Sequence, residues 1–192
     1  MFESPHAIPI TVTAAVVIFI LRELLEGHRR RTANNRKLAA IKNQLASECE
    51  RTNWAIRWIR SAISDIRTAL EYRKDIKIET NFSGNRRLVF INEDGDSSSL
   101  VPKAYSQVID KYLFEVASLD SRLFAKMVDS LAGLAELNHV LESLVEYVEE
   151  TGQPWLEGWC DYASREVGIS EEPILYLYEA CTGLALTKTR LR

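Results

Sequence analysis

The stretch AIPITVTAAVVIFIL, residues 7–21, carries no charged side chain, and Thr11 and Thr13 hold its only side-chain hydrogen-bonding groups. A helix formed from it would be apolar on every side, which requires lipid or a deep protein core. Fifteen residues rise about 22 Å, and extension to Leu25 gives about 28 Å, close to the roughly 30 Å of a bilayer's hydrocarbon layer. The sequence therefore predicts a short single-pass membrane helix. A buried core helix with a basic end is the alternative.

The residues that flank this stretch set its expected orientation. A cleaved signal peptide would have basic residues before the apolar run and a small-residue cleavage site after it, and neither is present. The cations instead follow the run, between Arg22 and Lys42. The positive-inside rule then places the N-terminus outside the inner (plasma) membrane and the rest of the chain in the cytoplasm. We expect residues 1–31 to form the anchor and a basic juxtamembrane segment, and residues 32–192 a cytoplasmic helical domain.

Composition fits an anchor followed by one folded domain. The chain has 192 residues, of which 46% are hydrophobic and 27% are charged, and its net charge of −3 gives no general attraction to DNA. The three cysteines, Cys49, Cys160 and Cys181, are odd in number and far apart, which matches neither a disulfide framework nor a zinc site. We expect reduced, buried thiols, with a reactive or palmitoylated cysteine as the alternative.

A long amphipathic helix is predicted after the anchor. Its apolar positions recur at spacings of three and four, which is typical of one helix face with a seam narrow enough for coiled-coil packing. They are Leu38, Ile41, Leu45, Cys49, Thr52, Ile56, Ile59, Ile63, Ile66 and Leu70. Thr32 to Asn35 would cap a new helix if the chain broke there. Trp54 and Trp58 lie on a second face, which predicts packing against the C-terminal helices or against another copy in a homo-oligomer.

Alternating hydrophobicity replaces the helical period after this helix. Ile76, Ile78, Thr80 and Phe82, followed by turn residues and a returning run through Leu88 and Phe90, predict a β-hairpin at about residues 75–92. Residues 93–99 read as a polar loop, and Pro102 opens the next element.

The C-terminal half predicts three more helices. Residues 104–150 show a broad apolar face and should form one long helix that runs antiparallel to the first, so that its acidic end, with Glu142, Glu146, Glu149 and Glu150, meets the basic residues between Arg29 and Lys42. Pro154 should begin a third helix, and Ser170 with Pro173 a fourth. The expected fold is mainly α: a membrane helix, then a cytoplasmic antiparallel bundle with a small β-hairpin at its membrane-distal tip.

One cluster of cations is a candidate binding site. The hairpin should bring together Arg73, Lys74, Lys77, Arg86 and Arg87. With the backbone N–H groups of Ser83 to Asn85, such a cluster would hold a phosphate, such as that of a nucleotide second messenger. A solvated tip balanced by Asp94 and Asp96 is the alternative.

Catalytic patterns are sparse. Glu136 and His139 form a single Glu-x-x-His pair, and a di-metal bundle needs two such pairs, so we expect no metal and no cofactor. The spacing of Arg22 and His28 resembles the arginine–histidine motif of HEPN ribonucleases, which are helical bundles, but it lies at the membrane boundary and we assign no nuclease activity from it. An enzyme would have to use Glu157, Asp161 and Arg165 beside Trp155 and Trp159. We expect a protein that is not an enzyme.

Two functions follow as hypotheses. The first is a membrane-anchored, non-enzymatic helical protein that oligomerises and acts as a scaffold, regulator or membrane-perturbing effector. In the second, the architecture resembles that of small membrane effectors of bacterial antiviral defence systems. That resemblance implies a cytoplasmic domain that senses a cyclic nucleotide and anchors that open the membrane.

Overall fold

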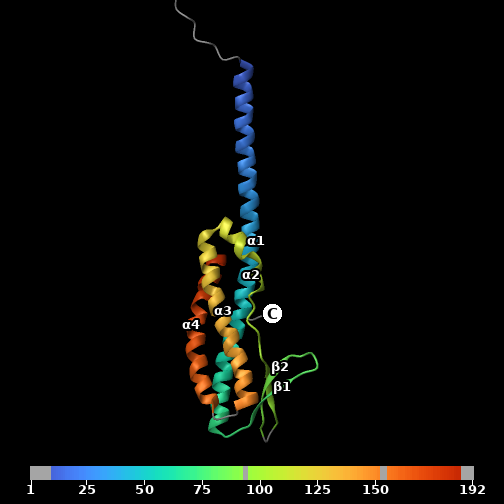
Figure 1. The fold of residues 1–192 in the computed structure, drawn as a ribbon, viewed down its shortest axis with the longest axis vertical. Helices are drawn as coiled ribbons and strands as arrows, with labels where there is room; N and C mark the ends of the chain where they lie inside the picture. The colour runs from blue at the N-terminus through green and yellow to red at the C-terminus, as the bar shows by residue number, and fades with distance from the viewer. Residues whose placement is uncertain (1–9, 93–94, 152–154, 187–192) are drawn as a thin grey trace, which may run out of the picture. The chain divides into compact units, whose positions relative to one another are not determined.

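A computed structural model describes residues 10–92, 95–151 and 155–186 of the chain. The described residues form four α-helices and one small antiparallel sheet, which confirms the predicted mainly α class (Figure 1). The chain divides into two compact units, residues 1–40 and residues 41–192. The first unit consists, in its described part, of the start of helix α1 (Ile10–Glu71). The second unit holds the helical bundle and the sheet.

Helix α1 continues without interruption through the segment where a new helix cap was predicted. The hydroxyl of Thr32 donates to the carbonyl of His28 at 3.0 Å, so it bonds back to the preceding turn and does not cap a helix start. In the second unit the predicted apolar stripe is confirmed as core, since Leu45, Ile56, Ile59 and Ile66 are fully buried. Burial of this stripe is what fixes α1 against the other helices.

The helix predicted over residues 104–150 is divided in the structure, so that prediction is wrong. Helix α2 (Gln107–Leu119) ends at Asp120, which has extended backbone, and helix α3 (Ser121–Glu146) follows. The carboxylate of Asp120 accepts hydrogen bonds from the backbone N–H groups of Arg122 and Leu123, at 3.2 and 3.0 Å. Asp120 is therefore the N-cap of α3 and allows the chain to reverse.

The contacts between helices give their directions. Helix α2 runs antiparallel to α1, because Glu48 contacts its start and Lys42 pairs with Asp120 at its end. Helix α4 (Leu156–Thr182) runs antiparallel to both α1 and α3, so α1 and α3 are parallel. Four pairs of contacts give this result: Cys160 with Ile63 and Tyr178 with Glu50 join α4 to α1, and Trp159 with Ser143 and Pro173 with Ser130 join it to α3.

The predicted meeting of the acidic helix end with basic residues is consequently wrong. The end of α3 continues into the π-helix η1 (Tyr147–Thr151), which contacts strand β1 near the end of α1. Glu142 and Glu146 therefore lie at the opposite end of the bundle from Lys42, whose partner is Asp120 at 3.7 Å. The reversal at Asp120 is the reason.

Helix α4 runs straight through the position where a fourth helix was predicted to begin. Pro173 lies inside it, and Ser170, Ile174 and Leu177 on the same helix are buried. Pro173 has no N–H to continue the helix ladder, but its carbonyl accepts a hydrogen bond from the Ser130 hydroxyl of α3 at 3.1 Å. Packing of this face on α3 keeps the helix continuous. Pro154, the predicted start of the third helix, lies outside the described residues.

The sheet contains one strand more than predicted. Strands β1 (Ile76–Thr80) and β2 (Arg86–Phe90) form the expected hairpin, and β3 (Ser97–Leu100) pairs antiparallel with the other edge of β2. The segment predicted as a polar loop therefore includes most of a strand. Between β3 and α2 the chain is extended, and the Asn138 side chain of α3 bonds both the N–H and the carbonyl of Ala104, at 3.1 and 3.0 Å.

Candidate functional site

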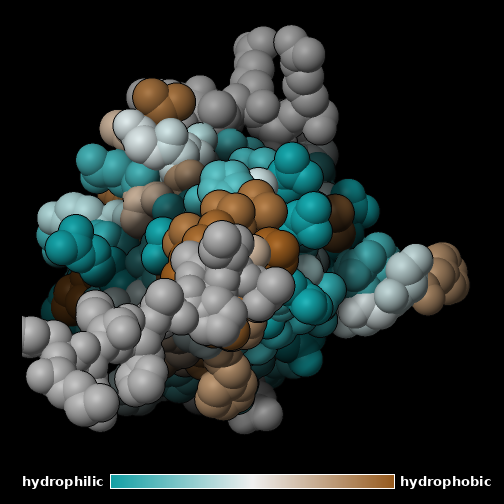
Figure 2. Space-filling model, turned by 90° about the horizontal axis from the view of Figure 1, so that it is seen from above, coloured by the Kyte–Doolittle hydropathy of each residue, from teal (hydrophilic) through white to brown (hydrophobic). Residues whose placement is uncertain are grey.

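The amino-terminal part of α1 exposes an unusual number of large apolar side chains. They are Val12, Val16, Val17, Ile18, Phe19, Ile20, Leu21, Leu24 and Leu25, each between 49% and 66% exposed. Six of them are consecutive, and at 100° per residue six consecutive positions surround the helix. Figure 2 shows hydrophobic residues gathered around the start of the described part of α1. We call residues 12–25 the apolar arm.

The length of this apolar stretch is limited. Across the described parts of the chain, every helix falls short of the combined length and hydropathy that a membrane crossing demands. Residues 7–9 of the predicted membrane helix lie outside the described residues, and the side chains of Thr11 and Thr13 are not described either.

The five cations of the predicted binding site do not meet in one cluster. Successive residues of a strand point to opposite faces, so Arg86 and Arg87 diverge. Arg87 lies opposite Glu79 in the pairing of β2 with β1, and Glu79 also binds Lys77 at 2.8 Å. This hydrogen bond raises the pKa of the Lys77 ammonium above its usual value. Arg86 shares the other face with Thr80.

The remaining two cations, Arg73 and Lys74, lie where α1 ends, at the other end of the hairpin from Arg86. The length of β1 separates the two groups by about 13 Å. Arg73 has a left-handed backbone conformation, with φ of 53°, which turns the chain from the helix into β1. The predicted set thus divides into three groups: Arg73 with Lys74, Lys77 with Arg87, and Arg86 alone.

The backbone N–H groups proposed to hold a phosphate are already used within the turn. Asn81 closes it: its side-chain oxygen accepts from the N–H groups of Ser83 and Asn85, at 3.0 and 2.9 Å, and its carbonyl accepts from Gly84 at 2.9 Å. Gly84 supplies the positive φ of 75° that this turn needs. Phe82 at the tip is fully exposed.

A cavity of about 410 Å³ lies between the end of α1 and the sheet. Lys74 is the one residue of the predicted set that lines it, together with Asp65 and Thr68 of α1 and with the serines of β3. Asn92 also lines it, and its side-chain N–H groups are held by the carbonyls of Phe90 and Gly95, at 3.4 and 3.3 Å. The cavity therefore offers a cation, a carboxylate and several hydroxyl groups. One signal for this cavity is present in the sequence, the run Ser97 to Ser99, which lies in the segment predicted as a polar loop.

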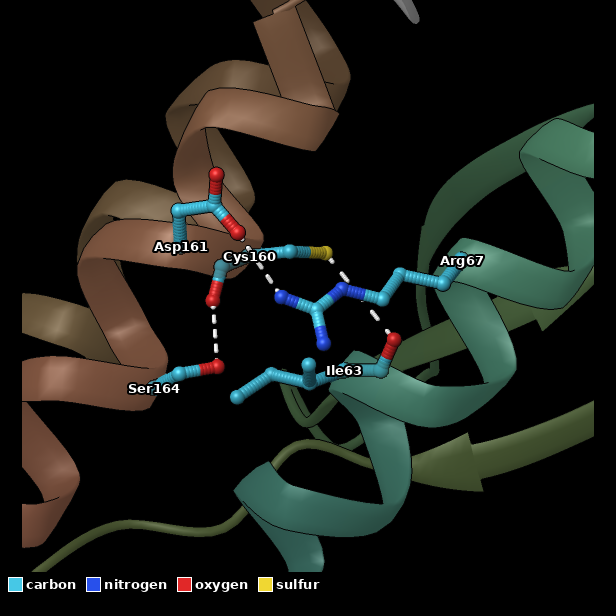
Figure 3. Close-up of polar contacts among 5 residues, drawn as sticks. All are labelled: Ile63, Arg67, Cys160, Asp161 and Ser164. Atoms are coloured by element: carbon cyan, nitrogen blue, oxygen red, sulfur yellow. Dashed lines mark hydrogen bonds and ion pairs between the residues drawn. The ribbon is translucent and has the colours of Figure 1, made fainter.

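The candidate catalytic groups of α4 are engaged in structural contacts. Asp161 pairs with Arg67 of α1 at 2.8 Å, and beside it the Cys160 thiol points toward the carbonyl of Ile63 (Figure 3). Arg165 pairs with its neighbour Glu166 at 2.8 Å. Trp159 is 1% exposed, and its indole N–H donates to the Ser143 hydroxyl at 3.1 Å, so it belongs to the core and not to a membrane interface. Asp161 and Trp159 therefore join α4 to α1 and α3, whereas Arg165 pairs within α4.

Of the other two patterns, the Glu136–His139 pair contacts Tyr162 of α4, and the Arg22–His28 pair makes no such contact in the described part of the chain. Glu136 accepts a hydrogen bond from the Tyr162 hydroxyl, and burial together with this bond raises the pKa of Tyr162 to about 12. The rings of His139 and Tyr162 are nearly perpendicular, and their centroids lie 6.2 Å apart. Where the chain is described, no three His, Cys, Asp or Glu side chains gather as metal ligands would. Arg22 and His28 are both exposed on α1.

The three cysteines are free thiols, as described by the structure. Cys49 and Cys160 are buried, and Cys181 is half-buried. Burial raises the pKa of all three, to about 11 for Cys160 and Cys181 and still higher for Cys49. Low thiolate content argues against nucleophilic roles for them.

Comparisons with protein-family models, with curated proteins and with solved structures give no match to this chain.

Proposed function

We propose that the protein is held at a membrane by its apolar arm, and that the helical bundle acts there as a scaffold, regulator or membrane-perturbing effector. The observation that carries this proposal is the exposure of apolar side chains on every side of the arm. A coiled-coil partner would cover one stripe of a helix, whereas lipid covers all of it. Covering nine half-exposed aliphatic or aromatic side chains is worth about 10 kcal/mol.

The proposed topology is a single pass with the bundle in the cytoplasm. Its support is the charge distribution along the sequence, because Lys and Arg residues follow the apolar run within residues 22–42, whereas residues 1–6 hold neither. A membrane-perturbing role requires several arms in one assembly. Light scattering of the detergent-solubilised chain measures the copy number, and a strict monomer would remove this part of the proposal.

A charge in the middle of the arm should weaken membrane binding. We expect Ile18→Lys to lower the partition of the full chain into lipid vesicles by about 70-fold or more, because a lysine at the centre of a hydrocarbon layer costs about 2.5 kcal/mol or more. Vesicle flotation measures the partition. Ile169→Lys is the matched control, since Ile169 of α4 is 63% exposed and Ile18 is 66% exposed.

The control should bind vesicles as the unchanged chain does. An equal loss of vesicle binding in both variants would mean that lysine acts through general solubility. No loss of binding in either variant would show that the apolar arm is not the part of the chain that binds the membrane. Circular dichroism should show the same helix content for all three proteins, because neither position is buried.

A second candidate function is ligand sensing by the bundle, and the cavity beside Lys74 favours it. Its volume of about 410 Å³ is within the range of small-molecule sites. We propose that this domain binds a nucleotide messenger, and that binding at the end of α1 is transmitted to the arm. The two faces of the hairpin, one with Arg86 and the other with Arg87, are the competing locations.

Thermal unfolding with cyclic mononucleotides and cyclic dinucleotides tests this function. At about ten times its Kd, a ligand should raise the unfolding midpoint by about 3–6 °C. Lys74→Gln should abolish the shift, and Lys103→Gln, an exposed lysine outside the cavity, should preserve it. Loss in Arg86→Ala/Arg87→Ala instead would place the ligand on the hairpin. No shift in the unchanged chain would reject a nucleotide ligand.

A further inference from the structure

The charge of the chain is distributed very unevenly. Between Gly27 and Ser47 there are six Lys or Arg residues and no Asp or Glu. The rest of the chain holds all 27 acidic residues against the remaining 18 Lys or Arg, so its net charge is −9. Such a basic segment in an acidic protein indicates an anionic partner that meets this segment alone.

Five of the six cations surround one short part of α1. They are Arg29, Arg30, Arg31, Arg36 and Lys37, which we call the basic collar, and all five are exposed. At 100° per residue, Arg36 lies within about 20° of Arg29, and Lys37 within about 20° of Arg30, while Arg31 occupies a third side. The sixth cation, Lys42, lies in the bundle and pairs with Asp120.

The position of the collar indicates which anion it meets. It begins about 6 Å along the helix beyond Leu25, the last residue of the apolar arm, and extends for about 12 Å. The polar layer on each side of a hydrocarbon core is about 5–8 Å thick. If the arm lies in hydrocarbon, the first cations are therefore at the depth of the phosphate groups. The long arginine side chains can reach that layer while their stems cover apolar surface.

Glu26 offsets one positive charge of the basic collar and leaves the others. Its carboxylate pairs with Arg30, one turn away. Glu23 and Glu26 are the only acidic residues between the middle of the arm and Glu48. The collar therefore keeps a strong positive charge at the boundary of the arm.

We propose that the basic collar binds the headgroups of anionic phospholipids, so that the protein selects negatively charged membranes. This inference rests on the proposed membrane anchoring. Each cation near an anionic surface adds a few-fold to binding, and the effect decreases with salt. A duplex nucleic acid is the other polyanion that such a segment would attract.

The test compares vesicles of phosphatidylcholine alone with vesicles that also contain about one-third phosphatidylglycerol, in flotation experiments with the full chain. The unchanged chain should bind the anionic vesicles at least 30-fold more tightly, and added salt should remove the difference. Arg29→Gln/Arg30→Gln/Arg31→Gln should bind neutral vesicles as before and lose about 30-fold on anionic vesicles. Glutamine keeps helix propensity, so α1 is preserved.

A matched control carries three such changes in the bundle: Arg73→Gln/Arg86→Gln/Arg87→Gln, all exposed positions. It should keep the preference for anionic vesicles, and loss of the preference there would overturn the collar in favour of the hairpin. Equal binding of the unchanged chain to both vesicle types would overturn the collar and leave the anchor intact. Binding to neither type would reject both proposals. Tight binding of a short DNA duplex at physiological salt, without preference for anionic vesicles, would assign the collar to nucleic acid.

Discussion

Replacing Trp159 by alanine is expected to lower the free energy of unfolding of the bundle by about 3–5 kcal/mol, the range for removing a large buried aromatic side chain. Trp159 is 1% exposed at the contact of α4 with α3. Its indole N–H donates to the Val140 carbonyl and the Ser143 hydroxyl, at 3.3 and 3.1 Å. The substitution would leave a cavity between two helices and remove both hydrogen bonds. Urea unfolding followed by circular dichroism measures the loss.

Two further variants test how much of this loss comes from the packing of Trp159 and how much from its hydrogen bonds. Trp159→Phe should cost about 1–2 kcal/mol, because most of the apolar contact remains and the Ser143 hydroxyl still bonds the Val140 carbonyl at 3.0 Å. Trp155→Ala, at the residue that precedes α4, should change stability by less than about 0.5 kcal/mol, because Trp155 is 64% exposed. If Trp155→Ala were as destabilising as Trp159→Ala, the assignment of Trp159 to the core would be wrong.

The second large effect is expected at Glu48. This glutamate of α1 is 5% exposed, and its two carboxylate oxygens accept hydrogen bonds from the N–H groups of Val108 and Ile109, at 2.8 and 3.2 Å. It caps the start of α2 from another helix, where Ser106, the residue before α2, makes no side-chain cap. Glu48→Ala should cost about 3 kcal/mol, because two buried N–H groups lose an ionised acceptor. Thermal or urea unfolding measures this cost.

The pH dependence of this contribution has a defined sign. Burial raises the pKa of Glu48 above its ordinary value of 4.5, although the two backbone hydrogen bonds lower it in part. In the pH range just above 4.5 the folded chain therefore binds more protons than the unfolded chain, and stability falls as pH rises. Glu48→Gln, which cannot ionise, should lack this fall. The free energy of unfolding of the unchanged chain should therefore fall relative to that of Glu48→Gln between pH 4.5 and pH 7. A rise relative to Glu48→Gln would contradict the raised pKa of Glu48.

The elements that the sequence predicts well are those whose pattern is local. The stripe from Ile41 to Ile66 has helical spacing throughout, and the alternation around Ile76 to Phe90 with Gly84 in the turn defines a hairpin. Both signals depend only on neighbouring residues. The apolar arm belongs to the same class, because its composition alone distinguishes it.

The elements that sequence reasoning missed depend on contacts between distant residues. The apolar pattern of residues 104–150 continues across Asp120. Only the hydrogen bonds that Asp120 accepts as a helix cap, and its pairing with Lys42, reveal that the chain reverses direction there. The serines of β3 have low strand propensity, and they form a strand because the second edge of β2 is open to pair. Pro173 is tolerated because α3 packs on its helix.

The reason why the predicted cations do not form one cluster was available in the sequence. A strand alternates its side chains, so adjacent Arg86 and Arg87 point to opposite faces of the sheet. The cavity residues Asp65 and Thr68, by contrast, are three apart on a helix and share a face, but their partner β3 was not predicted. Glu48 gave no sequence signal as a cap, because it lies about sixty residues from the helix that it completes.

The burial of the cysteines has a practical consequence for following the arm in lipid. Burial raises the pKa of Cys160 and Cys181 to about 11 and that of Cys49 further, so little thiolate is present at pH 7. A maleimide reagent, which attacks the ionised form, should therefore react more slowly with these three thiols than with an exposed one. A single new thiol from Ala14→Cys, at an exposed position of the arm, would take a polarity-sensitive fluorophore selectively without removal of any natural cysteine.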